Sequence, residues 1–120
     1  MNESILLTVK KMLGLNPDYE DEYDTDIIVF INSALMILNQ LGVGPDSAFM
    51  LTDGKETWQD FLGDDNGKLE SVKSYVYLKV KLVFDPPANS FVVNSIEKHI
   101  DELEWRLNVH SEEVKRNAKQ

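Results

Sequence analysis

The sequence predicts an all-α protein: a small bundle of four main helices, with one short helix in the long connection over residues 42–67. Apolar residues recur at intervals of three and four in four separate stretches, the spacing that places them on one face of a helix. Glycine or proline follows three of these stretches, and both residue types end helices. With 42% hydrophobic and 28% charged residues, the 120-residue chain has a globular composition. We therefore expect residues 1–120 to form a single domain.

The first two helices are predicted over residues 3–13 and 25–41, each followed by a glycine. The second has apolar residues on more than one face, which indicates burial on more than one side, in its own core or against a partner. Before it, residues 18–26 hold six acids and no base. Asp24 or Thr25 can cap the second helix, and the last acids suit its N-terminal dipole. The acidic run lacks the central glycine of a calcium-binding loop.

The connection over residues 42–67 is the least regular part of the sequence. Asp53 and Gly54 indicate a turn, and residues 57–62 suit a single short helix. A connection of this length is more often functional than idle. Two of its large aromatic residues, Trp58 and Phe61, indicate that the segment packs against another part of the structure, either the core of the chain or a protein partner.

The third and fourth helices are predicted over residues 68–84 and 90–109. Propensity alone would also allow a strand at 78–84, but the helical spacing holds over four turns and favours a helix. A pair of prolines ends the third helix, and Asn89 is a candidate cap for the fourth, which carries a heptad-like apolar seam. The polar tail, residues 111–120, either continues the fourth helix or frays.

Charge is distributed unevenly along the chain, whose formal net charge is −9. Residues 1–65 carry 13 acids and 3 bases, a net charge of −10, whereas residues 66–120 carry 8 acids and 9 bases, a net charge of +1. An acidic protein gains no affinity for phosphate backbones from counterion release, so ordinary DNA or RNA binding is disfavoured. The acidic surface either keeps the protein in solution or repels nucleic acid.

No arrangement of residues in the sequence predicts catalysis, a cofactor or a metal. His99 and His110 lie eleven residues apart on one predicted helix, whereas helical metal ligands sit three or four residues apart. The glycines match no nucleotide-binding fingerprint, and a chain without cysteine has no disulfide or thiolate site. We therefore expect a protein that is not an enzyme and binds no cofactor.

Nothing in the sequence indicates a membrane. No apolar run approaches the roughly 20 residues that span a bilayer, and the first residues lack the basic and apolar regions of a signal peptide. We therefore expect the protein to be made and used in the cytoplasm, with no membrane partner.

The stretch over residues 72–87, VKSYVYLKVKLVFDPP, resembles the hallmark segment of the head–tail connector (head-completion adaptor) family of long-tailed phages and prophages. Further segments agree with the family pattern in order and spacing, so that the similarity covers about residues 5–110. These segments are DTDII at 24–28, LNQLGVGP at 38–45, WQDFL at 58–62, SF at 90–91, IEK at 96–98 and ELEWRLN at 102–108.

The resemblance implies a function that composition alone does not indicate. Members of this family are small helical bundles that assemble as a ring, typically of twelve subunits, beneath the portal protein after DNA packaging. The ring extends the DNA channel and gives a platform to a downstream connector, stopper or tail protein, while DNA passes only as cargo. The family members are not enzymes. The expected locations are the host cytoplasm during assembly and then the head–tail junction of the virion.

Within such a ring we expect three groups of residues to lie at contacts. The fourth helix and its polar tail, with Trp105, Arg106 and His110, are predicted to contact the portal. Segment 46–67, which carries Trp58, Phe61 and Leu62, is predicted to contact a neighbouring copy or the downstream protein. Acidic residues are predicted to face the channel, where they would let DNA slide without sticking; these are Asp18, Glu20, Asp21 and Glu22.

Two other classes of function remain open from the sequence. The first is a small acidic helical partner-binding or regulatory protein of phage or bacterial origin, which would share the heptad-like seam and the acidity. The second is a metal-dependent enzyme that uses the acids of residues 18–26, although no nucleophile or phosphate-binding loop accompanies them.

Overall fold

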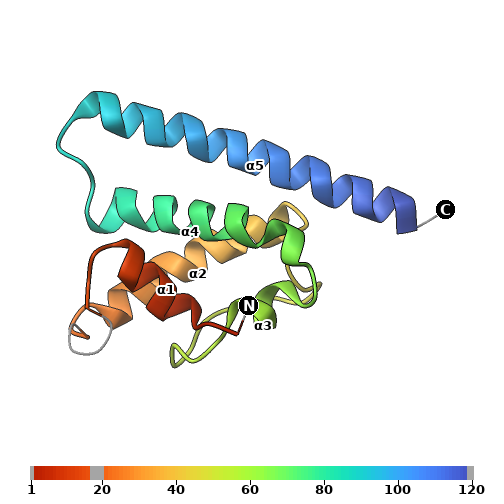
Figure 1. Ribbon diagram of the computed structural model, residues 1–120, viewed down its shortest axis with the longest axis horizontal. Helices are drawn as coiled ribbons and strands as arrows, with labels where there is room; N and C mark the ends of the chain where they lie inside the picture. Colours follow the sequence, from red (N-terminus) through yellow and green to blue (C-terminus); the bar gives the residue numbers. More distant parts are fainter. Residues whose placement is uncertain (1, 17–20, 119–120) are drawn as a thin grey trace.

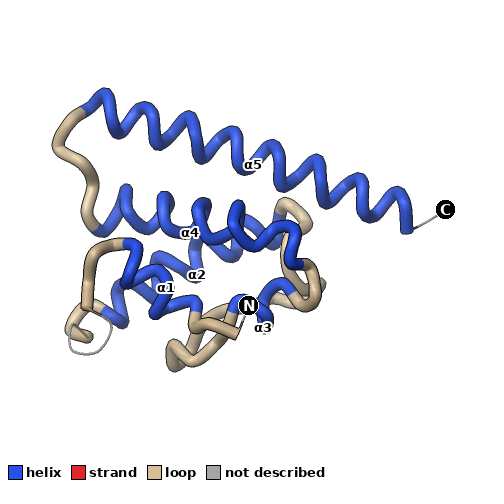
Figure 2. The backbone as a smooth tube through the Cα atoms, in the orientation of Figure 1, coloured by secondary structure: helices blue, strands red, loops and turns tan. Residues whose placement is uncertain are grey.

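A computed structural model describes residues 2–16 and 21–118 of the chain (Figure 1). Within these residues Figure 2 shows only helices and loops, with no β-strand, which confirms the predicted all-α class. The elements are α1 (Ile5–Met12), α2 (Asp24–Gln40), α3 (Trp58–Leu62), a 3-10 helix η1 (Asn66–Lys68), α4 (Leu69–Phe84) and α5 (Ser90–Ala118). The four long helices and the short one in the connection therefore all lie where the sequence predicts them.

The helices form layers, with α4 between α5 on one side and α1 and α2 on the other (Figure 1). α4 and α5 run antiparallel and are joined by residues 85–89. α5 is the longest helix, and its C-terminal end extends past the rest of the fold. The described chain is consequently elongated, with extents of 48 × 34 × 20 Å.

The hydrophobic core lies between α1, α2, α3 and α4, with Val43 and Leu51 added from the connection. α5 contributes Ile100, Leu103 and Leu107, which are spaced three and four residues apart and face α4. No residue of α5 before Ile100 is fully buried. The first ten residues of α5 are therefore the part of this helix with the least support from the rest of the chain.

The start of α2 differs from the sequence prediction. Tyr23 is its N-cap residue and makes no side-chain capping hydrogen bond, so neither Asp24 nor Thr25 caps the helix as predicted. Asp24 lies in the first turn and pairs instead with Lys10 of α1, with 2.8 Å between Lys10 Nζ and Asp24 Oδ1. The Lys10 side chain is buried, and a buried ammonium requires a charged partner. This tertiary demand explains why the carboxylate turns toward α1 rather than toward its own helix end.

The start of α5 and its C-terminal half agree with the sequence. Asn89 Oδ1 accepts hydrogen bonds from the backbone N–H groups of Phe91 (2.8 Å) and Val92 (3.4 Å) and so caps the helix. The sequence left open whether the polar tail continues the fourth helix or frays. In the structure the tail continues the helix, which reaches Ala118. Ser111 is buried there, and its Oγ accepts a hydrogen bond from Lys68 Nζ at 3.2 Å.

The long connection is attached to the helices by polar contacts. The Leu51 backbone N–H donates to Asn32 Oδ1 (2.7 Å), and Asn32 Nδ2 donates to the Leu51 carbonyl oxygen (3.0 Å). α3 begins with a capping box, in which Thr57 and Asp60 each accept a hydrogen bond from the other's backbone N–H. The connection is therefore ordered against α2 despite its irregular sequence.

A carboxylate organises the turn that precedes α3. Glu56 accepts hydrogen bonds from the Thr52 backbone N–H and hydroxyl, both at 2.9 Å, and from the Gly54 backbone N–H at 3.1 Å. Burial of the Glu56 carboxylate raises its pKa, but the hydrogen bonds from residues 52, 53 and 56 outweigh this and hold the pKa below its ordinary value of 4.5. The ionised form is therefore the one that the folded turn favours.

This shift predicts a pH dependence of stability. Because the folded-state pKa of Glu56 is the lower one, its contribution is fully present above pH 4.5 and is lost as the pH falls through the folded-state value. Glu56→Gln should therefore destabilise the chain at neutral pH and lose less stability than the wild type on acidification. Urea unfolding of both proteins at neutral pH and below pH 4.5 measures this. Parallel losses of stability in the two proteins would contradict it.

Candidate interaction surfaces

An apolar groove lies between α2 and the connection. Its volume is about 380 Å³, and we call it the α2 groove. Val29, Met36 and Met50 in this groove are all more than half exposed, and exposed apolar side chains that gather in one patch often mark an interaction site. The lining residues are Val29, Asn32, Ser33, Met36, Asn39, Ala48, Phe49 and Met50.

The polar side chains of the α2 groove already have partners within the chain. Asn32 is bonded to Leu51 through both its oxygen and its nitrogen, as described above. Asn39 Nδ2 donates to the Pro45 carbonyl oxygen at 2.6 Å, and Ser33 Oγ donates to the Val29 carbonyl oxygen at 3.2 Å. Because these polar groups already hydrogen-bond within the chain, they have little capacity left to bind a polar ligand. The groove therefore suits an apolar side chain better than a polar small molecule.

A second apolar surface lies where α4 ends and α5 begins. Val83, Phe91 and Val92 are exposed there, and Phe91 is 76% exposed, the highest value among the large apolar residues of the described chain. We call these three residues the hairpin tip. In sequence they flank residues 85–89, the loop that joins α4 and α5.

A third surface is the outer side of α5. Trp105 is 67% exposed, and Arg106 and His110 are also exposed. The Arg106 guanidinium contacts Glu102 Oε1 through both Nε (3.1 Å) and Nη2 (2.7 Å). An exposed pair of this kind contributes little to stability.

Polar contacts fix the rotation of α5 and therefore which residues face outward. The Tyr75 hydroxyl of α4 donates to Glu104 Oε2 at 2.7 Å, and Asn108 Nδ2 donates to the Leu41 carbonyl oxygen at 3.2 Å. Burial raises the pKa of Tyr75 well above its ordinary value of 10, with the Glu104 hydrogen bond and charge adding to the effect. Tyr75 therefore stays protonated and remains a donor.

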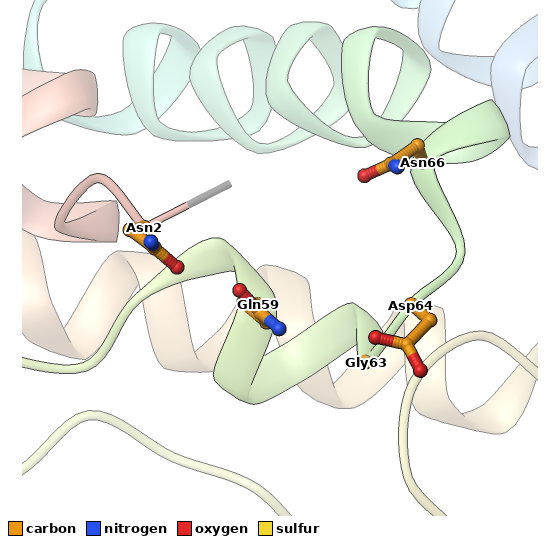
Figure 3. Close-up of a pocket in the computed structure, with 5 residues that line it drawn as sticks. All are labelled: Asn2, Gln59, Gly63, Asp64 and Asn66. Carbon is orange, nitrogen blue, oxygen red and sulfur yellow. The ribbon is translucent and has the colours of Figure 1, made fainter.

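A polar pocket lies near the N-terminus, with a volume of about 420 Å³. Figure 3 shows its lining residues: Asn2 comes from the start of the chain, and Gln59, Gly63, Asp64 and Asn66 come from α3 and the turn that follows it. The lining offers one carboxylate, three amides and no cation. It lacks the combination of an apolar wall and converging polar groups that is typical of cofactor sites.

The described residues contain no group of three or more histidines and acids close enough to share a metal ion. Of the acids proposed for a metal-dependent enzyme, Asp24 is paired with Lys10, and Asp18 and Glu20 lie outside the described residues. Among the described helices, none has both the length and the apolar composition that crossing a bilayer requires.

The residues predicted at contacts fall into two groups by exposure. Trp105, Arg106 and His110 lie on the surface. Trp58 and Phe61 are buried in the core of the chain, where their neighbours are α1 and the connection, and Leu62 is half-buried. The segment around them does reach a surface, but through Phe49 and Met50 of the α2 groove.

Sequence reasoning missed the groove residues Val29, Met36 and Met50. A signal for two of them was present, because apolar residues on more than one face of the second helix indicated burial on more than one side. Of the acids predicted to face a channel, Asp21 and Glu22 are exposed, while Asp18 and Glu20 lie outside the described residues.

The described residues form a small all-helical subunit with exposed apolar side chains on α2, α4 and α5. The sequence matches the family model for phage connector proteins over residues 5–114, so the chain belongs to the phage connector family and is a structural protein of the connector type. Comparisons with curated proteins and with solved structures gave no match. The family match favours a connector over an unrelated regulatory protein or a metal-dependent enzyme.

Proposed function

We propose that this chain is one subunit of a ring, typically of twelve copies, that assembles beneath the portal protein once DNA is packaged. The ring would extend the DNA channel at the head–tail junction and give a platform to the downstream connector, stopper or tail protein. The observation that carries the proposal is the family match over residues 5–114, nearly the whole chain. The subunit would fold in the host cytoplasm and act without catalysis or a cofactor.

The distribution of exposed apolar residues supports assembly into a ring. A closed ring requires a heterologous interface, in which each subunit uses different patches toward its two neighbours. The chain has separate apolar patches of this kind, because the α2 groove and the hairpin tip involve different elements. Both patches are exposed in the single chain and are therefore available for assembly.

We assign the portal contact to the outer side of α5, with Trp105, Arg106 and His110. Tryptophan and arginine are enriched among the residues that dominate binding energy at interfaces, and Trp105 and Arg106 are both exposed on α5. The projecting C-terminal end of α5 makes this side accessible to a large partner (Figure 1).

This assignment predicts a loss of portal binding on substitution. Trp105→Ala should weaken binding to the portal protein by about 2 kcal/mol, roughly 30-fold, because the indole would be an anchor at that contact. Glu97→Ala, also exposed on α5, is the control and should bind like the wild type. Interferometry with immobilised portal measures both. Equal affinities for Trp105→Ala and the wild type would contradict the assignment.

We further propose that the acidic residues 18, 20, 21 and 22 face the DNA channel. Carboxylates release no counterions from phosphates, so a channel lined with them would let DNA pass without sticking. Exposure of Asp21 and Glu22 is compatible with this role. A structure of the assembled ring tests it: a net acidic lining is expected, and a net basic lining would contradict the proposal.

A further inference from the structure

We infer that Lys68 is a positioning residue for the portal contact, because its buried ammonium fixes the end of α5 that projects from the fold. This inference rests on the proposed function and adds to it the residue that orients the proposed contact surface. Lys68 ends η1 and is buried, so it is not itself placed to bind a partner. It acts through Ser111, which directly follows His110 on α5.

The Lys68 ammonium has two partners, one on each side of the contact. Nζ donates to Ser111 Oγ at 3.2 Å and lies 3.4 Å from Oδ2 of Asp65, the residue just before η1. Burial of a lysine ammonium is costly unless polar or charged groups bind it, and the flexible stem of the side chain would otherwise carry the charge to water. Because both Lys68 and Ser111 are buried, the contact is enclosed and holds together two segments that are 43 residues apart.

This contact lies where the support of α5 by the rest of the chain ends. The buried residues of α5 are spaced three and four apart on one side of the helix, and they are Ile100, Leu103, Leu107 and Ser111. Ser111 is the last of them among the residues whose burial the structure describes, and residues 112–114 are exposed. The helix continues to Ala118, about 10 Å further along its axis. A small tilt at Ser111 would therefore displace the projecting end and turn the adjacent His110.

The other polar contacts of α5 hold the helix nearer its middle. Glu104 accepts a hydrogen bond from Tyr75, and Asn108 donates to the Leu41 carbonyl oxygen. Both precede Ser111, so loss of the Lys68 ammonium should leave this part of α5 in place while the turns that follow gain freedom. That freedom would have to be removed again when the portal binds, and ordering a segment on binding lowers affinity.

Distances between pairs of spin labels measure the orientation of the projecting end, because the chain has no cysteine of its own to interfere with labelling. Labels at Met12→Cys on α1 and Glu113→Cys on α5 report the projecting end, and labels at Met12→Cys and Asp101→Cys report the supported part of α5. Lys68→Met, introduced into each labelled pair, removes the ammonium and keeps an apolar stem. The distance distribution between residues 12 and 113 should widen, and the one between residues 12 and 101 should not.

A second variant and a binding measurement complete the test. Ser111→Ala should widen the same distribution, and adding it to Lys68→Met should widen it no further, because both substitutions remove one contact. The affinity of Lys68→Met for immobilised portal, measured by interferometry, should fall about tenfold. Lys11→Met is the matched control, because it removes the same charge from an exposed lysine on α1 and should bind like the wild type.

The outcomes separate the inference from the proposed function. An unchanged distribution at residue 113 would overturn the inference, and so would equal widening at residues 101 and 113, which would indicate a general loss of stability. Widening at residue 113 without a loss of portal affinity would also overturn it, because the orientation would then not matter to the contact. A wild-type chain that does not bind the portal would overturn the proposed function instead, whatever the label distances show.

Discussion

Trp58→Ala is expected to lower the free energy of unfolding by about 3–5 kcal/mol, the range for removing a large aromatic side chain from a core. The indole is 0% exposed, and its Nε1–H donates to the Thr8 hydroxyl oxygen at 3.1 Å, which joins α3 to α1. Alanine would leave a cavity between these helices and remove the hydrogen bond from Trp58 Nε1 to the Thr8 hydroxyl. A domain of this size is stable by about 5–15 kcal/mol, so the loss is a large part of the total.

The chain's other tryptophan is the matched control for this prediction. Trp105 is 67% exposed, so Trp105→Ala should change the free energy of unfolding by no more than about 0.5 kcal/mol. Urea unfolding followed by circular dichroism measures both variants. A similar destabilisation by the two substitutions would contradict the burial that the structure assigns to them.

Gly44→Ala is the second substitution expected to have a large effect, a loss of about 3 kcal/mol. Gly44 has φ of +93°, where an L side chain is strained, and a Cβ there would lie 2.5 Å from Phe61 Cε1 and 2.7 Å from Phe61 Cζ. The Phe61 ring is buried and packs against Phe49, with 5.4 Å between the ring centroids, so it cannot move without disturbing the core.

Gly14 is the control that separates backbone strain from collision of the added Cβ, because its backbone geometry is similar to that of Gly44. Gly14 has φ of +86°, and a Cβ added there would meet no atom within 4 Å. Gly14→Ala should therefore cost only the backbone strain, about 1 kcal/mol. Thermal unfolding of the two variants gives the comparison. If Gly14→Ala were as destabilising as Gly44→Ala, the predicted collision with Phe61 would not be the cause.

The fold could be predicted from the sequence because its helices carry strong local signals. The second helix was predicted over residues 25–41 and lies at Asp24–Gln40, since a sustained apolar spacing and a following glycine mark its course. The local sequence pattern did not determine whether residues 111–120 continue the fourth helix or fray, and in the structure α5 reaches Ala118. Ser111 is held by Lys68 from a distant segment, and such a tertiary contact has no local signature.

The candidate surfaces were predictable only in part. Trp58 and Trp105 are the same residue type on predicted helices, yet one is buried and the other exposed, because burial depends on which neighbouring helix covers each face. The apolar character of the second helix indicated a further contact, but the groove also needs residues 48–50, which Asn32 holds in place through Leu51. Contacts between distant segments of this kind determine the surface and are not visible in a local pattern.

We propose that exposed apolar surfaces on this helical subunit serve to assemble a ring on the portal. Electron cryomicroscopy of the purified chain mixed with its portal protein tests this most directly. The account predicts a closed ring coaxial with the portal, with the outer side of α5 against the portal and no large apolar patch left uncovered between subunits. A portal that stays bare, or one that binds isolated copies without contact between them, would contradict it.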